Sequence, residues 1–208
     1  MKESSSVGGI LKLGLVLALF AATACVGLAF VYTGTEERIA DNQTAKLDAA
    51  LKDIFGDDAV FEEIAGFLPA GENAVSFGTA YRAKKGNVLA GIALNVSVTG
   101  FNDTLTALVG VGTDGNITGV RILKDTDTPG LGANAASPNY FVDKPENTKT
   151  FYGQFTGMAL DGTIKVAKDG GRVQAVTAAT VTSRAVALLV NTAGEAGKKW
   201  LAAEGGLK

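Results

Sequence analysis

The sequence contains no histidine and only one cysteine, Cys25. Without histidine, the chain lacks the commonest general base and the commonest transition-metal ligand of proteins. A single cysteine makes no internal disulfide, no cysteine-rich zinc site and no cysteine-ligated iron–sulfur cluster. The sequence therefore predicts no metal site, and any redox chemistry in this chain would depend on an organic cofactor.

A basic surface is also missing. Lysine and arginine number 19 against 21 aspartates and glutamates, so the formal net charge is -2. Because such a chain has no positive field to attract phosphates, nucleic acid is excluded as a partner. A length of 208 residues and an apolar content of 47% are enough for one modest domain with an ordinary core and a separate anchor.

One long apolar run is present near the N-terminus. Residues 13–32, LGLVLALFAATACVGLAFVY, carry no charge, and about 20 such residues cross a bilayer as a helix. Lys2 and Lys12 precede the run, and Glu36 and Glu37 follow it. This asymmetry predicts a single-pass anchor in the cell inner (plasma) membrane, in contact with lipid, with a cytoplasmic N-terminus and an extracytoplasmic C-terminal part.

Two other interpretations of this run stay open. Ala22-Thr23-Ala24 resembles the cleavage site of a signal peptide, and Cys25 has the place of the acylated residue of a lipoprotein. The run continues to Tyr32, so cleavage would leave an apolar segment exposed at the new terminus. A retained anchor is the favoured interpretation.

The hydrophobic pattern of the remaining chain predicts an α+β fold. Helix-like spacing covers residues 36–55 and ends at Gly56. Four strand-like segments form two predicted hairpins, 75–83 with 88–99 and 105–112 with 117–123. A loop at 125–138, a short strand at 163–167 and a helix from Thr180 to about Trp200 complete the pattern.

These elements divide the chain into three predicted parts. Residues 1–34 form a cytoplasmic tip and a transmembrane helix, residues 35–70 a connecting helix and linker, and residues 71–208 an extracytoplasmic domain. Strands that pair as neighbours, with helices at both ends, predict one domain with an antiparallel sheet and flanking helices.

One candidate site is the loop Asp127-Thr128-Pro129-Gly130-Leu131-Gly132. Glycine lets backbone come close to a planar ligand, and this loop offers amide groups and one leucine to such a ligand. An ordinary turn is the competing interpretation, because Pro-Gly commonly marks turns.

A second candidate site is the start of the last predicted helix. Its residues are Thr177, Ala178, Ala179, Thr180, Thr182 and Ser183. With Thr180 as the predicted N-cap, the free backbone N–H groups and the helix dipole favour a phosphate there. Thr182 and Ser183 would add hydrogen bonds to it, and the two alanines would leave it room. A simple threonine N-cap is the competing interpretation.

Four motifs in this order, behind the predicted anchor, resemble those of one family. They are Gly100-Phe101, the segment 109–133 with its DTPGLGA ending, FYGQFTG at 151–157, and QAVTAATVTS at 174–183. Together they are similar to the FMN-binding subunits RnfG and NqrC of bacterial ion-translocating redox complexes. The resemblance covers nearly the whole chain, and the length of the chain is more typical of RnfG than of NqrC.

The resemblance implies a covalent flavin. In this family FMN is held through a phosphoester on the last threonine of the S/T-G-A-T motif, and the matching residue here is Thr180. A dedicated flavin transferase installs the group. The resemblance also implies that the loop 127–132 lies beside the flavin and that the chain, an FMN-binding domain, supplies no catalytic residue of its own.

The implied function is that of an electron-relay subunit of a membrane-bound Rnf complex. Such a complex is a ferredoxin:NAD⁺ oxidoreductase and a translocase of Na⁺ or H⁺, and the other Rnf subunits, especially its membrane subunits, would be the partners. The alternatives are an NqrC-like subunit of Na⁺-translocating NADH:quinone reductase, a stand-alone extracytoplasmic flavoprotein, and a non-redox anchoring subunit without flavin.

Three residues depart from the family pattern. Gln174 and Ala178 stand where the family has aspartate and glycine, and Asp127 stands where it has glutamate before TPGLG. An added methyl group in a tight turn and a lost charge are expected to bear on flavin attachment more than on the fold.

Overall fold

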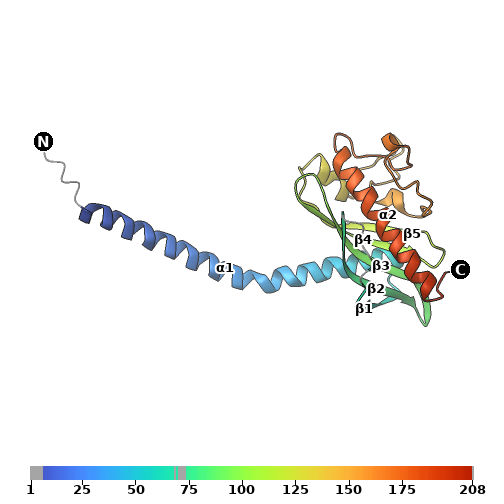
Figure 1. The fold of residues 1–208 in the computed structure, drawn as a ribbon, viewed down its shortest axis with the longest axis horizontal. Helices are drawn as coiled ribbons and strands as arrows, with labels where there is room; N and C mark the ends of the chain where they lie inside the picture. The colour runs from blue at the N-terminus through green and yellow to red at the C-terminus, as the bar shows by residue number, and fades with distance from the viewer. Residues whose placement is uncertain (1–6, 68, 70–73, 208) are drawn as a thin grey trace. The chain divides into compact units, whose positions relative to one another are not determined.

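The computed structural model describes residues 7–67, 69 and 74–207, and the chain divides into two compact units, Met1–Ala45 and Lys46–Lys208. Helix α1 (Val7–Phe55, 49 residues) begins in the first unit and ends in the second (Figure 1). Residues 8–46 of this helix are exposed. In the described part of the chain, α1 is the one helix long and apolar enough to cross a membrane, judged by length and composition.

The end of α1 confirms the stop predicted at Gly56. This residue has a φ of +96°, and its N–H donates to the carbonyl of Lys52 at 2.7 Å. Glycine takes this left-handed conformation without the steric cost that a side chain would add. The predicted membrane segment and the predicted helix at 36–55 thus belong to one continuous helix.

The second unit contains a five-stranded antiparallel sheet whose spatial order follows the sequence. The strands are β1 (Ala59–Ile64), β2 (Val75–Lys85), β3 (Val88–Thr99), β4 (Thr104–Gly112) and β5 (Ile117–Lys124). The α+β class, the antiparallel sheet and both predicted hairpins are confirmed. From β2 to β5, neighbouring strands are joined by short turns, which fixes this simple order.

Two strand predictions need correction. β1 lies in the 35–70 segment, for which the sequence predicted only a helix and a linker, and it pairs with β2. Glu62 of β1 forms an ion pair with Lys84 of β2, and this contact between the two strands exists only in the folded chain. The short strand predicted at 163–167 is wrong, because this segment forms an isolated bridge between Val166 and Val173 and no strand. The predicted domain boundaries at residues 34 and 70 stay predictions.

Helix α2 (Thr180–Ala203) covers one face of the sheet (Figure 1). Successive residues of a strand point to opposite faces, and β3 divides its side chains accordingly. Ile92 and Leu94 belong to the large core that includes Leu189 of α2. Ala93, between them, belongs to a smaller core with Phe55 at the end of α1. The sheet is therefore covered by a helix on each face.

Glycines in the strands let α1 approach the sheet closely. Gly110 of β4 and Gly119 of β5 are register partners. A Cβ atom on Gly110 would lie 2.4 Å from Cγ2 of Ile54, and one on Gly119 would lie 3.2 Å from Cγ1 of the same residue. The absence of side chains here creates the groove that Ile54 fills.

Two glycines in α2 likewise allow this helix to approach the other face of the sheet closely. Gly194 and Gly197 weaken the helical pattern of the sequence, yet the helix continues to Ala203. A Cβ on Gly194 would lie 2.3 Å from Leu160, and one on Gly197 would lie 2.8 Å from Val111. Close packing against the core compensates for their low helix propensity.

We predict that Gly110→Ala lowers the free energy of unfolding by about 1–3 kcal/mol, because the added methyl group would overlap Ile54 in a filled core. Urea denaturation of the full chain in detergent measures this change. Gly34→Ala is the matched control, since nothing lies within 4 Å of its Cβ position. Equal stability of the two variants would show that α1 does not depend on this close approach.

Candidate functional site

The two candidate segments of the sequence meet in one pocket of about 280 Å³. The loop after β5 and the start of α2 each contribute predicted site residues to its wall: Asp127, Thr128, Leu131 and Gly132 from the loop, and Ala178, Ala179, Thr180 and Thr182 from the helix start. Folding thus brings together two motifs that are about 50 residues apart.

The other predicted site residues stand outside the lining. These are Pro129, Gly130, Thr177 and Ser183. Conversely, Phe101 and Val181 line the pocket without having been predicted as site residues. Phe101 belongs to the Gly100-Phe101 motif of the sequence. No sequence signal marked Val181, which lies beside Thr180.

Asp127 connects three parts of the pocket. Its Oδ1 accepts the backbone N–H of Asn102 at 3.0 Å, and its Oδ2 accepts the hydroxyl of Thr182 at 2.5 Å. A Cβ atom on Gly132 would lie 2.4 Å from Oδ2, so glycine is required beside this carboxylate. Asp127 therefore fastens the loop to α2 and to the turn between β3 and β4.

Two of the hydroxyls at the helix start have partners within the protein. Thr182 and Ser183 were expected to bind a phosphate, but both are buried and already have protein partners. Thr182 donates to Asp127, while Ser183 donates to the carbonyl of Ala179 at 2.8 Å and accepts the N–H of Val176 at 2.9 Å. These two side chains fix the first turn of α2.

Thr180 differs from its two neighbours. It is the first residue of α2, and the N-cap is Ala179, which corrects the prediction of a threonine N-cap. Thr180 is half-buried, and among the hydrogen bonds between described residues its hydroxyl takes part in none. At a helix start, free backbone N–H groups and the helix dipole favour an anionic group on such a hydroxyl.

The backbone before Thr180 takes a turn that alanine adopts at a cost. Ala178 has a φ of +60°, a left-handed conformation, and it stands where the family pattern has glycine. Ala179 then donates its N–H to the carbonyl of Val176 at 3.1 Å. The substitution keeps the turn and adds a steric strain of about 1–2 kcal/mol.

A buried glutamine holds the segment that leads into this turn. The Gln154 amide donates to the carbonyl of Gln174 at 3.0 Å, and its oxygen accepts the N–H of Gln174 at 2.7 Å. The contact uses only the backbone of Gln174, so the replacement of aspartate by glutamine leaves it intact. The Tyr140 hydroxyl likewise accepts the N–H of Thr177 at 2.9 Å.

The rim of the pocket is apolar and exposed. Phe101, Leu131 and Val181 line the pocket, and they are 67%, 43% and 50% exposed. Large apolar side chains that gather at one place on a surface mark a binding site.

A second acidic residue lies next to Asp127. The Oδ1 of Asp125 accepts the N–H of Asp127 at 2.9 Å, whereas its Oδ2 is buried and, within the described chain, without a hydrogen-bond partner. Burial raises the pKa of Asp125, the N–H of Asp127 opposes that shift, and the negative charge of Asp127 adds to it.

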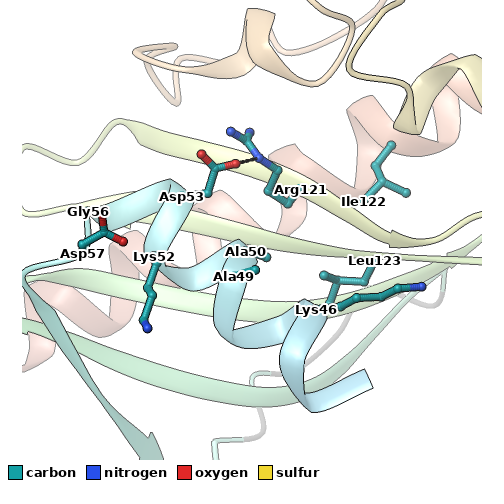
Figure 2. Close-up of a pocket in the computed structure, with 10 residues that line it drawn as sticks. All are labelled: Lys46, Ala49, Ala50, Lys52, Asp53, Gly56, Asp57, Arg121, Ile122 and Leu123. Atoms are coloured by element: carbon teal, nitrogen blue, oxygen red, sulfur yellow. Dashed lines mark hydrogen bonds and ion pairs between the residues drawn. The ribbon is translucent and has the colours of Figure 1, made fainter. Parts of the chain in front are cut away.

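A larger hollow of about 780 Å³ lies between the end of α1 and β5 (Figure 2). Asp53 and Arg121 form an ion pair across it, and the Arg121 guanidinium also lies 4.7 Å from the centre of the Tyr152 ring. None of the predicted site residues lines this hollow. The smaller pocket, which unites the sequence motifs, is the candidate site.

The polar side chains of the pocket lining are one carboxylate and three hydroxyls. The Asp127 carboxylate accepts from two donors, and the hydroxyls belong to Thr128, Thr180 and Thr182. A flat ring under the apolar rim and a phosphoryl group on Thr180 fit these residues.

Comparison with known proteins places two family matches on the chain. The FMN-binding domain family matches residues 100–195, and the RnfG N-terminal region matches residues 1–54. The first match spans the whole candidate pocket, and the second spans nearly all of α1.

Three relatives share one name, that of a subunit of the ion-translocating oxidoreductase complex. The protein from Shewanella amazonensis is 30% identical over 85% of this chain and 82% of its own length. The protein from Methanosarcina acetivorans is 30% identical over 85% and 88%, and that from Shewanella oneidensis is 32% identical over 88% and 87%. Among solved structures, Shewanella oneidensis NqrC aligns with 73% of this chain and 88% of its own, at 18% identity and a TM-score of 0.48.

We predict that Ala178→Gly raises the free energy of unfolding by about 1 kcal/mol, because glycine takes a left-handed φ without strain. Denaturant titration of the full chain measures the gain. The matched control is Ala179→Gly, whose φ of -126° suits alanine and which should cost about 0.4–1 kcal/mol. If both variants lose stability, Ala178 carries no strain.

Proposed function

This chain belongs to the RnfG family, whose members are subunits of the ion-translocating oxidoreductase complex, and from this premise we propose that it relays electrons within an Rnf complex through FMN bound covalently to Thr180. The complex would be a ferredoxin:NAD⁺ oxidoreductase that moves Na⁺ or H⁺. The chain would act in it as a carrier subunit and contribute no catalytic residue.

The observation that carries this proposal is the meeting of Thr180 with the loop 127–132 in one pocket. Thr180 has a hydroxyl free of hydrogen bonds among the described residues, while Thr182 and Ser183 use theirs to hold the site. Attachment at Thr180 would leave those supporting bonds in place. A phosphoryl ester there would lie at the positive end of α2.

The size and rim of the pocket support a partly exposed flavin. A volume of about 280 Å³ lies just below the usual range for ligand pockets, so part of a flavin would stay outside the pocket. The exposed side chains of Phe101, Leu131 and Val181 would contact the ring. Bound flavin supplies electron transfer in single or paired steps, and an exposed edge would let partner carriers approach it.

The anchor supports a place in the membrane. Helix α1 has the length and composition to span a bilayer, and the cationic residues before it favour a cytoplasmic N-terminus and an extracytoplasmic flavin domain. A covalent link would prevent loss of the cofactor outside the cytoplasm. The other Rnf subunits would be its partners, and a flavin transferase would install the group.

We predict that Thr180→Ala abolishes bound flavin, because the variant has no hydroxyl to form the ester. Intact mass of the purified protein and flavin fluorescence on a denaturing gel measure the loss, and the wild type should gain the mass of FMN less one water. Ferredoxin:NAD⁺ activity should disappear while the complex still assembles.

Thr99→Ala is the control for this test, since Thr99 is an exposed threonine that lies outside both the pocket lining and the motif 174–183. It should keep the flavin. An unmodified wild-type mass, from a host with an active flavin transferase, would refute covalent attachment. Full activity of Thr180→Ala would refute the relay.

A further inference from the structure

Asp127 is a buried carboxylate in the wall of the pocket. It is 7% exposed, and its two donors are the N–H of Asn102 and the hydroxyl of Thr182. No ion pair between described residues includes it, whereas Asp161 and Asp169 each pair with an arginine at the surface. Burial of a carboxylate without a cation costs free energy, so this placement needs a reason.

The surrounding chain is shaped to keep the carboxylate in place. A Cβ atom on Gly132 would lie 2.4 Å from Oδ2, and one on Gly100 would lie 3.8 Å from Oδ1. Both partners are donors, which suits an ionised carboxylate, because that group only accepts hydrogen bonds. The carboxylate therefore has one fixed position in the wall that it shares with Thr180.

Asp125 adds to the acidic character of this wall. Its carboxyl group accepts the N–H of Asp127, and it too forms no ion pair among the residues that the structure describes. Burial raises the pKa of Asp125, and the negative charge of Asp127 adds to that shift. Neither Asp125 nor Asp127 has an ion-pair partner among the described residues, and the charge of Asp127 gives this wall a negative field.

We propose that the buried charge of Asp127 lowers the reduction potential of the flavin held in this pocket. The inference rests on the proposed function. Reduction adds negative charge to the ring, and a fixed negative charge in a desolvated wall opposes that addition. Salt screens a buried charge only weakly, so the effect persists at physiological ionic strength.

The test is a spectroscopic redox titration of the purified, flavin-bearing full chain. Asp127→Asn keeps the shape of the side chain and removes its charge. It should raise the midpoint potential by about 59 mV, which corresponds to a tenfold change in the equilibrium constant of a one-electron reduction. Asp127→Glu keeps the charge and should stay near the wild-type potential.

Asp161→Asn is the matched control, because it removes one carboxylate from an exposed ion pair with Arg172. It should leave the potential unchanged. Flavin content by intact mass and the urea midpoint are measured for every variant, so that a change in potential is read only from folded, loaded protein. Asp127→Ser serves as a second neutral variant.

Each outcome decides the inference. A raised potential in a neutral variant, with Asp127→Glu and Asp161→Asn unchanged, supports it. A wild-type potential in loaded Asp127→Asn overturns it and leaves the proposed function intact. If both neutral variants fail to fold or bind flavin while Asp127→Glu succeeds, Asp127 has a purely structural role and the inference is overturned. A wild type without flavin would instead overturn the proposed function.

Discussion

The hydrogen bond between Thr182 and Asp127 joins the two halves of the candidate site. One partner follows the last strand of the sheet, and the other lies in the first turn of α2. This bond is a direct link between the loop 127–132 and the first turn of α2. The same carboxylate also accepts from the β3–β4 turn, so a single side chain sets the position of three pocket walls.

The site also depends on glycines, whose lack of a side chain leaves room for neighbouring groups. Gly132 leaves room for the Asp127 carboxylate, as Gly110 leaves room for Ile54 on the far face of the sheet. In both places a methyl group would meet a fixed neighbour, and packed interiors have little free space to relieve such overlap. The abundance of glycine in this chain therefore reflects close packing as well as turns.

Two departures from the family pattern, Gln174 and Ala178, are compatible with the backbone conformation before α2. Gln174 replaces an aspartate, but Gln154 binds its main chain and not its side chain. Ala178 replaces a glycine and keeps the left-handed turn at the cost of strain. The start of α2 thus retains its geometry, and Thr180 keeps a hydroxyl free of the supporting hydrogen bonds.

The sequence alone determined the local elements and the motifs. Local signals mark the charge-free run that ends at Tyr32, the hairpins with their turns, and the end of the helix at Gly56. They are local because periodicity and glycine conformation act over a few residues. Only the tertiary structure decided which hydroxyls are free, that β1 joins the sheet, and that Phe101 and Val181 border the pocket. These features depend on contacts between distant segments, such as Asp127 with Thr182, and no local pattern encodes which partner a buried polar group will find.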